Sequence, residues 1–167
     1  MRRNSAWLYL ILSLAVQLAM VSCDRKMLYH HYEHTTLGGW DKNDTLLFTV
    51  PAARQRAVVQ RDVEIRISGD YPFQQLNLIV EQTTLPTSKE TGPFPGKTIS
   101  RRDTLNCSLI DREGNIKGDG ISLYQYRFHM TDISVNEGDS ICICIRHNMK
   151  REILPGIADV GIRLTTY

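Results

Sequence analysis

Cysteines and histidines are the side chains of this 167-residue chain that could act as nucleophiles or bind a metal ion. Cys142 and Cys144 are separated by one residue, whereas zinc-binding cysteines are usually separated by roughly two to four. His30, His31 and His34 lie close together near the N-terminus, outside any predicted strand, and we expect them to be solvated. The residue types and their spacing therefore predict no metal site and no bound cofactor.

Cys23 differs from the other cysteines because of the segment before it. Residues 1–22 begin with two arginines after Met1, continue into an apolar run and contain no acidic residue. This order is typical of a signal peptide, a helical export signal that is later removed. The segment ends in Met20-Val21-Ser22-Cys23, which is typical of a bacterial lipobox. We predict that Cys23 becomes the first residue and carries fatty acyl chains such as palmitate; the alternative is an ordinary signal peptide.

The remaining cysteines are Cys107, Cys142 and Cys144, an odd number that cannot all pair within one chain. We expect free thiols with a structural role, and a disulfide from Cys107 to one of the other two is the alternative. The chain also lacks the Gly-x-Ser-x-Gly, His-Glu-x-x-His and phosphate-loop motifs of common enzymes. These observations favour a non-enzymatic protein for which we expect no small-molecule ligand.

The charge balance argues against a nucleic-acid partner. The whole chain has 20 Lys and Arg against 18 Asp and Glu. Subtracting the two arginines within residues 1–22 leaves 18 basic and 18 acidic residues in the remaining 145 positions. Proteins that bind nucleic acid normally carry a basic excess or a basic stripe. A neutral chain of this length is expected to form one domain with one core.

Alternation of apolar and polar residues must position whatever site exists, and it predicts strands rather than helices. Clear alternation occurs in seven segments, separated by turn-forming residues: 46–50, 62–68, 76–80, 103–111, 124–130, 141–145 and 160–164. We predict an all-β fold after the signal helix, a single antiparallel β-sandwich of about seven or eight strands over residues 44–167. Residues 23–43 are expected to be a lipid-anchored tether, although they could also lie along the domain. Residues 85–102 are expected to form a long surface loop.

Exposed aromatic residues could instead form a sugar-binding face. The candidates are Trp40, Tyr71, Phe73 and Phe94. Aromatic side chains in a sandwich usually belong to the core, so this second hypothesis, a glycan-binding accessory protein of the cell envelope, depends on whether these four are exposed.

Sequence motifs spread over nearly the whole chain match one protein family. They are Gly39-Trp40, Tyr71-Pro72-Phe73, residues 103–109, Lys117-Gly118-Asp119-Gly120 and, most specifically, residues 147–151 together with 154–163. In these motifs and in its lipobox the chain resembles the GldH family of gliding-motility lipoproteins. The resemblance implies a membrane-anchored lipoprotein with Cys23 as the lipid attachment site, and it supplies no catalytic residue.

The resemblance also implies a cellular setting. In motile members the family is required for gliding and is linked to type IX secretion. We therefore expect a scaffold or assembly factor whose partners are other motility and secretion proteins of the envelope. The expected location is the periplasmic side of the outer membrane, with the inner membrane as the alternative.

Two further sets of residues are predicted to take part in interactions. The C-terminal motif offers a docking surface for a partner protein through Arg146, Met149, Lys150, Arg151 and Pro155, or it serves only to pack the last strand. Thr45 and Thr104 each follow an aspartate and precede a leucine, a pattern at which exported proteins of this bacterial lineage are O-glycosylated. Both threonines could equally mark the start of a strand.

Overall fold

The computed structural model describes residues 26–87 and 98–166. Within these ranges every regular element is a β-strand. The described residues contain no helix that is long and apolar enough to cross a membrane. The strands are β1 (Lys26–His34), β2 (Trp40–Asp41), β3 (Leu46–Val50), β4 (Ala57–Ser68), β5 (Gln75–Leu85), β6 (Ile99–Ser108), β7 (Asp119–Gly120), β8 (Leu123–Val135), β9 (Ser140–His147), β10 (Ile153–Leu154) and β11 (Ile157–Thr166).

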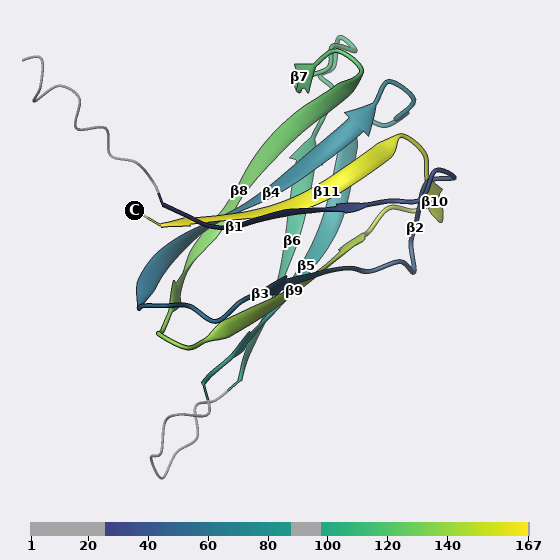
Figure 1. Cartoon of the computed structure of the whole chain (residues 1–167). Coiled ribbons are helices and arrows are strands. Elements are labelled where there is room, and N and C mark those ends of the chain that lie inside the picture. Colours follow the sequence, from purple (N-terminus) through teal and green to yellow (C-terminus); the bar gives the residue numbers. More distant parts are fainter. Residues whose placement is uncertain (1–25, 88–97, 167) are drawn as a thin grey trace, which may run out of the picture.

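The strands form two layers; in Figure 1, β3 and β9 of the second layer lie below β1, and β5 and β6 pass behind the first layer. One sheet has the order β1-β11-β4-β8-β7, the other has the order β3-β9-β5-β6, and β10 pairs with β2. All pairings are antiparallel. The predicted antiparallel sandwich is confirmed, and each of the seven segments with clear alternation lies largely within a strand.

The hydrophobic core lies between the two sheets because alternate residues of each strand point inward. In β9 the inward residues Ile141, Ile143 and Ile145 are buried, whereas Cys142 and Cys144 face outward and are half-buried. In β4 the side chains of Val59, Val63, Ile65 and Ile67 are buried in the same core. Burial of this kind, at about 25 cal/mol per Å² of apolar surface, is the main force that holds the layers together.

One charged side chain crosses the core and links the two sheets. Arg61 of β4 is 1% exposed. Its Nε donates to the carbonyl oxygen of Thr131 at 2.9 Å, and its Nη1 donates to Oε1 of Gln82 at 2.7 Å. Its Nη2 lies 3.3 Å from Oδ2 of Asp103 on β6. Burial lowers the pKa of Arg61, and the neighbouring Asp103 opposes that shift.

The structure differs from the predicted tether of residues 23–43. Lys26–His34 form β1, which pairs with β11 along nearly its whole length, for example Tyr32 with Gly161. This strand lacks clear alternation because it lies at the edge of the sheet, where most of its side chains are exposed or half-buried. The predicted loop of residues 85–102 is also shorter, since β6 begins at Ile99.

The sandwich has two ends, which are named here for the positions of their residues. The proximal end holds the start of β1 and the end of β11, together with residues 50–57 and 135–140. The distal end holds the β2–β10 pair and residues 35–45, 68–75 and 147–157. In Figure 1 the start of β1 lies at the left and β10 at the right. Because β1 begins at the proximal end, the predicted attachment site Cys23 precedes that end in the chain.

Candidate functional site

A buried carboxylate on the outer face of the five-stranded sheet organises a polar cluster that joins three strands. The side chain of Glu64 in β4 is 0% exposed. It accepts hydrogen bonds from Nε2 of His30 at 2.7 Å, from Nε of Arg127 at 2.7 Å, and from the hydroxyl of Tyr32. These four residues come from β1, β4 and β8 and are called the Glu64 cluster below.

A glycine allows β1 to reach Glu64 across the intervening strand. Gly161 of β11 pairs with Tyr32 on one side and with Glu64 on the other. A Cβ atom on Gly161 would lie 2.7 Å from the ring of Tyr32. The absence of a side chain there therefore lets the ring lie flat over β11. The guanidinium carbon of Arg66 lies 3.9 Å from the centre of the same ring, a cation–π contact that holds it in place.

The electrostatics of the cluster indicate a structural role. Burial by itself raises the pKa of Glu64, but the hydrogen bonds from Tyr32, His30 and Arg127 outweigh it and lower that pKa. Burial and the hydrogen bond to Glu64 raise the pKa of Tyr32 to about 12. At neutral pH the carboxylate is ionised, fully hydrogen-bonded and closed to solvent, so it is a poor base. The cluster fastens β1 to the sheet.

The N-terminal histidines are exposed, as predicted, but they lie on a strand, and two of them also bond buried carboxylates. His30 binds Glu64, and Nδ1 of His34 bonds the nearly buried Asp159, while the His34 side chain stays 82% exposed. The partners lie 34 and 125 positions away in sequence, so local spacing gave no signal for them. Over the described ranges, no three metal-ligating side chains gather in a way that could hold an ion.

The residues predicted to dock a partner are divided between the surface and the core. Lys150 and Arg151 are exposed in the turn after β9. Arg146 faces outward and lies 3.5 Å from Glu81, while Met149 and Pro155 are half-buried, and Met149 packs against the core. The structure thus brings these five residues to the distal half of the sandwich but exposes two of them fully.

The distal end is closed by two buried rings. The rings of Trp40 and His147 lie 5.3 Å apart in an edge-on arrangement, and each residue is 1% exposed. Burial lowers the pKa of His147, so this ring is neutral in the folded protein at neutral pH. Trp40 and Tyr71 are buried, Phe73 is half-buried, and Phe94 lies outside the described residues. The structure therefore does not favour the predicted glycan-binding face.

The positions predicted to be modified have different surroundings. Thr45 is exposed just before β3, and Thr104 is exposed on the edge strand β6, so glycosylation of either stays a prediction.

Cys23, the predicted lipid attachment site, lies outside the described residues. Cys107, Cys142 and Cys144 are free thiols, and burial raises the pKa of Cys107 to about 12, which makes it unreactive.

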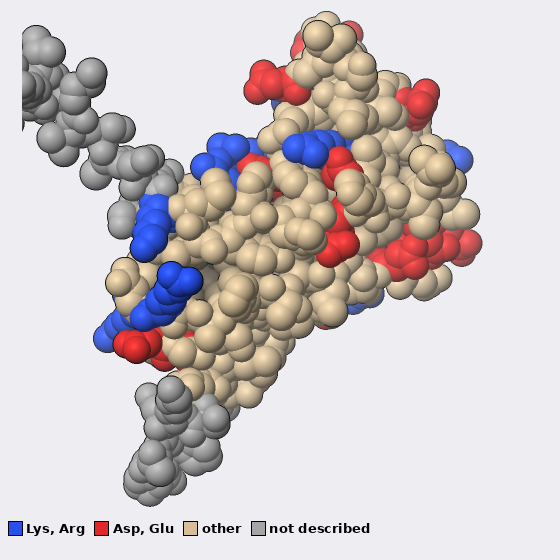
Figure 2. Space-filling model, viewed as in Figure 1, with Lys and Arg blue, Asp and Glu red and all other residues tan. Residues whose placement is uncertain are grey.

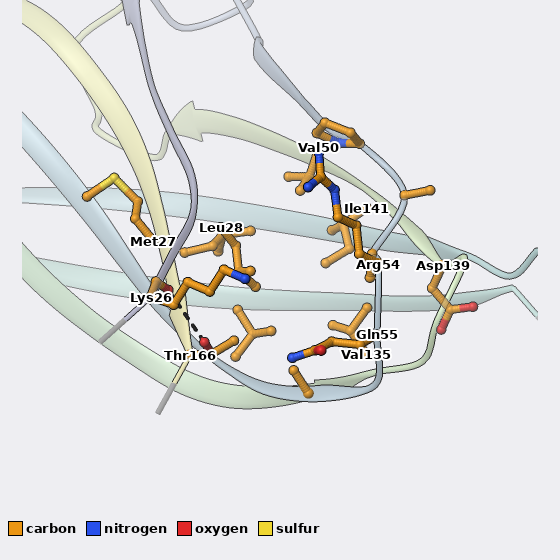
Figure 3. A pocket seen from close by; sticks show the side chains of 16 residues that line it. Lys26, Met27, Leu28, Val50, Arg54, Gln55, Val135, Asp139, Ile141 and Thr166 are labelled. Atoms are coloured by element: carbon orange, nitrogen blue, oxygen red, sulfur yellow. Dashed lines mark hydrogen bonds between the residues drawn. The ribbon is translucent and has the colours of Figure 1, made fainter. Parts of the chain in front are cut away.

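A cavity of about 500 Å³ opens at the proximal end, between the two sheets. Figure 3 shows its walls: Lys26, Met27 and Leu28 of β1 on one side, and Val50, Arg54 and Gln55 on the other. Val135, Ile141 and Leu164 form part of its apolar lining. Local sequence patterns do not indicate this cavity, because its walls come from four separate segments of the chain.

Comparisons with known proteins place this structure in a family. A family model described as GldH lipoprotein matches residues 27–164, from the second residue of β1 into β11. The gliding motility lipoprotein GldH of Flavobacterium johnsoniae is 27% identical over 158 residues, which cover 90% of this chain and 92% of that protein. The GldH homolog of Christiangramia forsetii is 27% identical over 153 residues, 86% of each chain.

Solved structures add no functional information. An aminopeptidase from a marine-sediment Thaumarchaeota archaeon aligns with a TM-score of 0.38 and 8% identity, over 87% of this chain and 32% of that one. This similarity is too low to support any argument. The family model, in contrast, spans both sheets and far more than half of the sequence. The chain belongs to the GldH lipoprotein family.

Proposed function

We propose that this protein is a gliding-motility lipoprotein that acts, without catalysis, as a scaffold or assembly factor of the gliding and type IX secretion apparatus. The observation that carries the proposal is the match of the GldH lipoprotein model to residues 27–164, together with two relatives named as gliding motility lipoproteins or their homologs. The relatives' names indicate gliding motility only; the scaffold role and the link to type IX secretion are further parts of the proposal.

A non-catalytic role is supported by the chemistry of the polar cluster. Glu64 is ionised, buried and bonded by three donors, which leaves no free acid, base or nucleophile at its centre. The half-exposed Arg127 and His30 are likewise committed to it. The cluster stabilises an edge strand instead of presenting reactive groups.

The partners proposed are envelope proteins that contact the distal end. Lys150 and Arg151 are exposed there, and so are two apolar side chains, Leu37 and Ile153. Exposed apolar residues beside polar ones are common at protein–protein interfaces. The distal end lies at the far side of the sandwich from the start of β1, where it would be accessible to other proteins.

The membrane attachment is proposed at Cys23, on the periplasmic side of the outer membrane. In the native host, Cys23→Ala should leave an unacylated precursor and abolish membrane-anchored mature protein. Cys142→Ala is the matched control, because it removes a half-buried thiol from the sandwich and should not change acylation. Fractionation of the two membranes then tests the location, and recovery in the inner membrane would contradict it.

The cellular role is tested by deleting the gene in a gliding host. We expect loss of gliding and retention of secreted cargo, restored by the wild-type gene but not by Cys23→Ala. Cross-linking of intact cells followed by mass spectrometry should recover motility or secretion proteins joined to the distal end. A deletion strain that glides and secretes normally would contradict the proposed function.

A further inference from the structure

We propose that the proximal end of the sandwich is a membrane-contact surface that binds an anionic phospholipid, with the phosphate between Lys26 and Arg54 and an acyl chain in the cavity. This inference rests on the proposed lipid anchor at Cys23. It goes further, because an anchor alone leaves the orientation of the domain undetermined.

The predicted anchor lies close to the sandwich along the chain. Only two residues separate Cys23 from Lys26, the first residue of β1. At about 3.3–3.6 Å per residue, three steps span at most about 11 Å. A free tether of residues 23–43 could instead have reached about 66 Å at about 3.3 Å per residue. Because residues 26–34 are in the sheet, an acylated Cys23 holds the start of β1 within about 11 Å of the membrane surface.

The surface that this distance brings to the membrane carries basic side chains. Lys26, Arg54 and Arg56 are exposed at or beside the cavity, and none of them forms an ion pair with another residue in the described part of the chain. Figure 2 shows basic side chains gathered at the end of the molecule where β1 begins. Figure 3 shows the side chain of Lys26 extending from β1 toward the segment that carries Arg54.

Acidic residues near this surface do not cancel its charge. Asp139 lines the cavity but is 8% exposed, and its Oδ2 accepts a hydrogen bond from the backbone N–H of Asn136 at 3.0 Å. Glu137 is exposed in the same turn. Among the described residues, three exposed cations against one exposed carboxylate give a positive rim, which attracts anionic lipid headgroups.

The opening of the cavity is lined by apolar side chains. Met27 and Leu28 are 49% and 43% exposed and line the cavity together with Val50, Ala57 and Ile141. A cationic rim around exposed apolar side chains is the combination that binds membrane interfaces. The cavity, about 500 Å³ in volume, falls within the range of small-ligand sites, roughly 300–1,000 Å³. A phospholipid from the adjoining membrane matches both features, since it carries a phosphate and an apolar chain.

The test uses mature lipoprotein reconstituted in vesicles of phosphatidylglycerol and phosphatidylcholine whose acyl chains carry bromine, which quenches tryptophan fluorescence on contact. Met27→Trp places a reporter at the proximal rim, and Leu37→Trp places a matched reporter on the fully exposed distal turn. The mature chain retains one native tryptophan, the buried Trp40, whose signal is subtracted with wild-type protein. We expect strong quenching for Met27→Trp and little for Leu37→Trp.

Charge reversal separates specific docking from mere proximity. Each of Lys26→Glu and Arg54→Glu, introduced into the Met27→Trp chain, should reduce the docked population in phosphatidylglycerol vesicles by about fivefold or more in equilibrium constant. Arg151→Glu, at the distal end, should have no effect. Native mass spectrometry should detect one phosphatidylglycerol on the wild type and none on the double reversal.

The outcomes are distinguishable. A chain that carries no acyl group and stays off the vesicles overturns the proposed function, and this inference with it. An acylated, vesicle-bound chain whose Met27→Trp and Leu37→Trp reporters are quenched equally overturns the inference alone. Quenching at Met27→Trp that is insensitive to both charge reversals, with no bound phospholipid detected, overturns the phospholipid site. Circular dichroism of each variant confirms that the sheets have formed.

Discussion

The two ends of the sandwich differ in how completely the chain fills them. At the distal end Trp40, His147 and Leu154 are at most 1% exposed, and the backbone turns approach so closely that glycine is required. At the proximal end a cavity of about 500 Å³ stays open between the sheets. Protein interiors are normally close-packed. The difference indicates that the distal end is filled by its own residues, whereas among the described residues the proximal end leaves room for a bound group.

The ends also differ in charge. The distal turns expose Lys42, Lys150 and Arg151 together with Asp44, Asp70 and Glu152, and Asp41 is half-buried, so three cations are balanced by four acids. The rim of the proximal end carries a basic excess instead. A balanced surface suits a protein partner, and a basic one suits anionic lipid.

Trp40→Ala should reveal the tight packing of the distal end most strongly. Removing a fully buried aromatic side chain costs about 3–5 kcal/mol of the free energy of unfolding. Met27→Ala, at the proximal rim, should change it by about 0.5 kcal/mol or less, because Met27 is half-exposed. Urea denaturation of both variants measures the difference. Equal losses would show that the two ends are packed alike.

Gly156→Ala tests the backbone geometry of the distal end. Gly156 has φ of +78°, and a Cβ atom there would lie 2.4 Å from the backbone nitrogen of Tyr71. We expect a loss of about 1–3 kcal/mol in the free energy of unfolding, from the strained conformation and the clash. Gly38→Ala is the matched control, because nothing lies within 4 Å of its Cβ position and its φ is not in the left-handed region. A neutral Gly156→Ala would contradict the described turn.

Glu64→Gln tests whether the Glu64 cluster fastens β1, which runs from the proximal to the distal end, to the rest of its sheet. The amide cannot accept charge-assisted hydrogen bonds from Tyr32, His30 and Arg127 as the carboxylate does, so we expect a loss of about 1–3 kcal/mol. Hydrogen exchange should accelerate in β1 and stay unchanged in β9. Glu81→Gln is the control, since Glu81 forms only exposed ion pairs. Unchanged exchange in β1 would contradict the structural role of the cluster.

Acidification should weaken the distal end before it weakens the hold on β1. Because burial lowers the pKa of His147 from 6.5, the unfolded chain takes up the proton first. The contribution of His147 to stability is therefore complete above its ordinary pKa and is lost as the pH falls below that value. The lowered pKa of Glu64 changes stability in the same direction, but its contribution is lost only as the pH falls below 4.5. Chemical denaturation over a pH series should show the first loss in wild type and not in His147→Gln.

The sequence predicted the strands well where one face of a strand is buried. Segments such as 141–145 alternate because every second side chain enters the core. It did not predict β1, whose residues lie at an edge with most side chains at or near solvent. The two-residue strands β2, β7 and β10 were also not predicted, because a segment of two residues is too short to show alternation.

The sites were harder to predict than the fold. Glu64 looked like an ordinary outward charge of an alternating strand, and its partners lie 34 and 63 positions away for His30 and Arg127. Trp40 seemed available for a ligand, yet it packs against His147, which is remote in sequence. Contacts of this kind depend on strand order, which local patterns do not encode. The lipid anchor, in contrast, was predicted from a local motif, and Cys23 lies outside the described residues.

Hydrogen–deuterium exchange of the wild-type lipoprotein tests the membrane-facing orientation most directly, because it requires no substitution. Exchange is compared between detergent and vesicles that contain phosphatidylglycerol. The predicted result is slower exchange in vesicles at residues 26–28 and 50–57, with no change at residues 36–44 and 148–153. Slower exchange confined to the distal residues, or no difference at the proximal ones, would contradict the account.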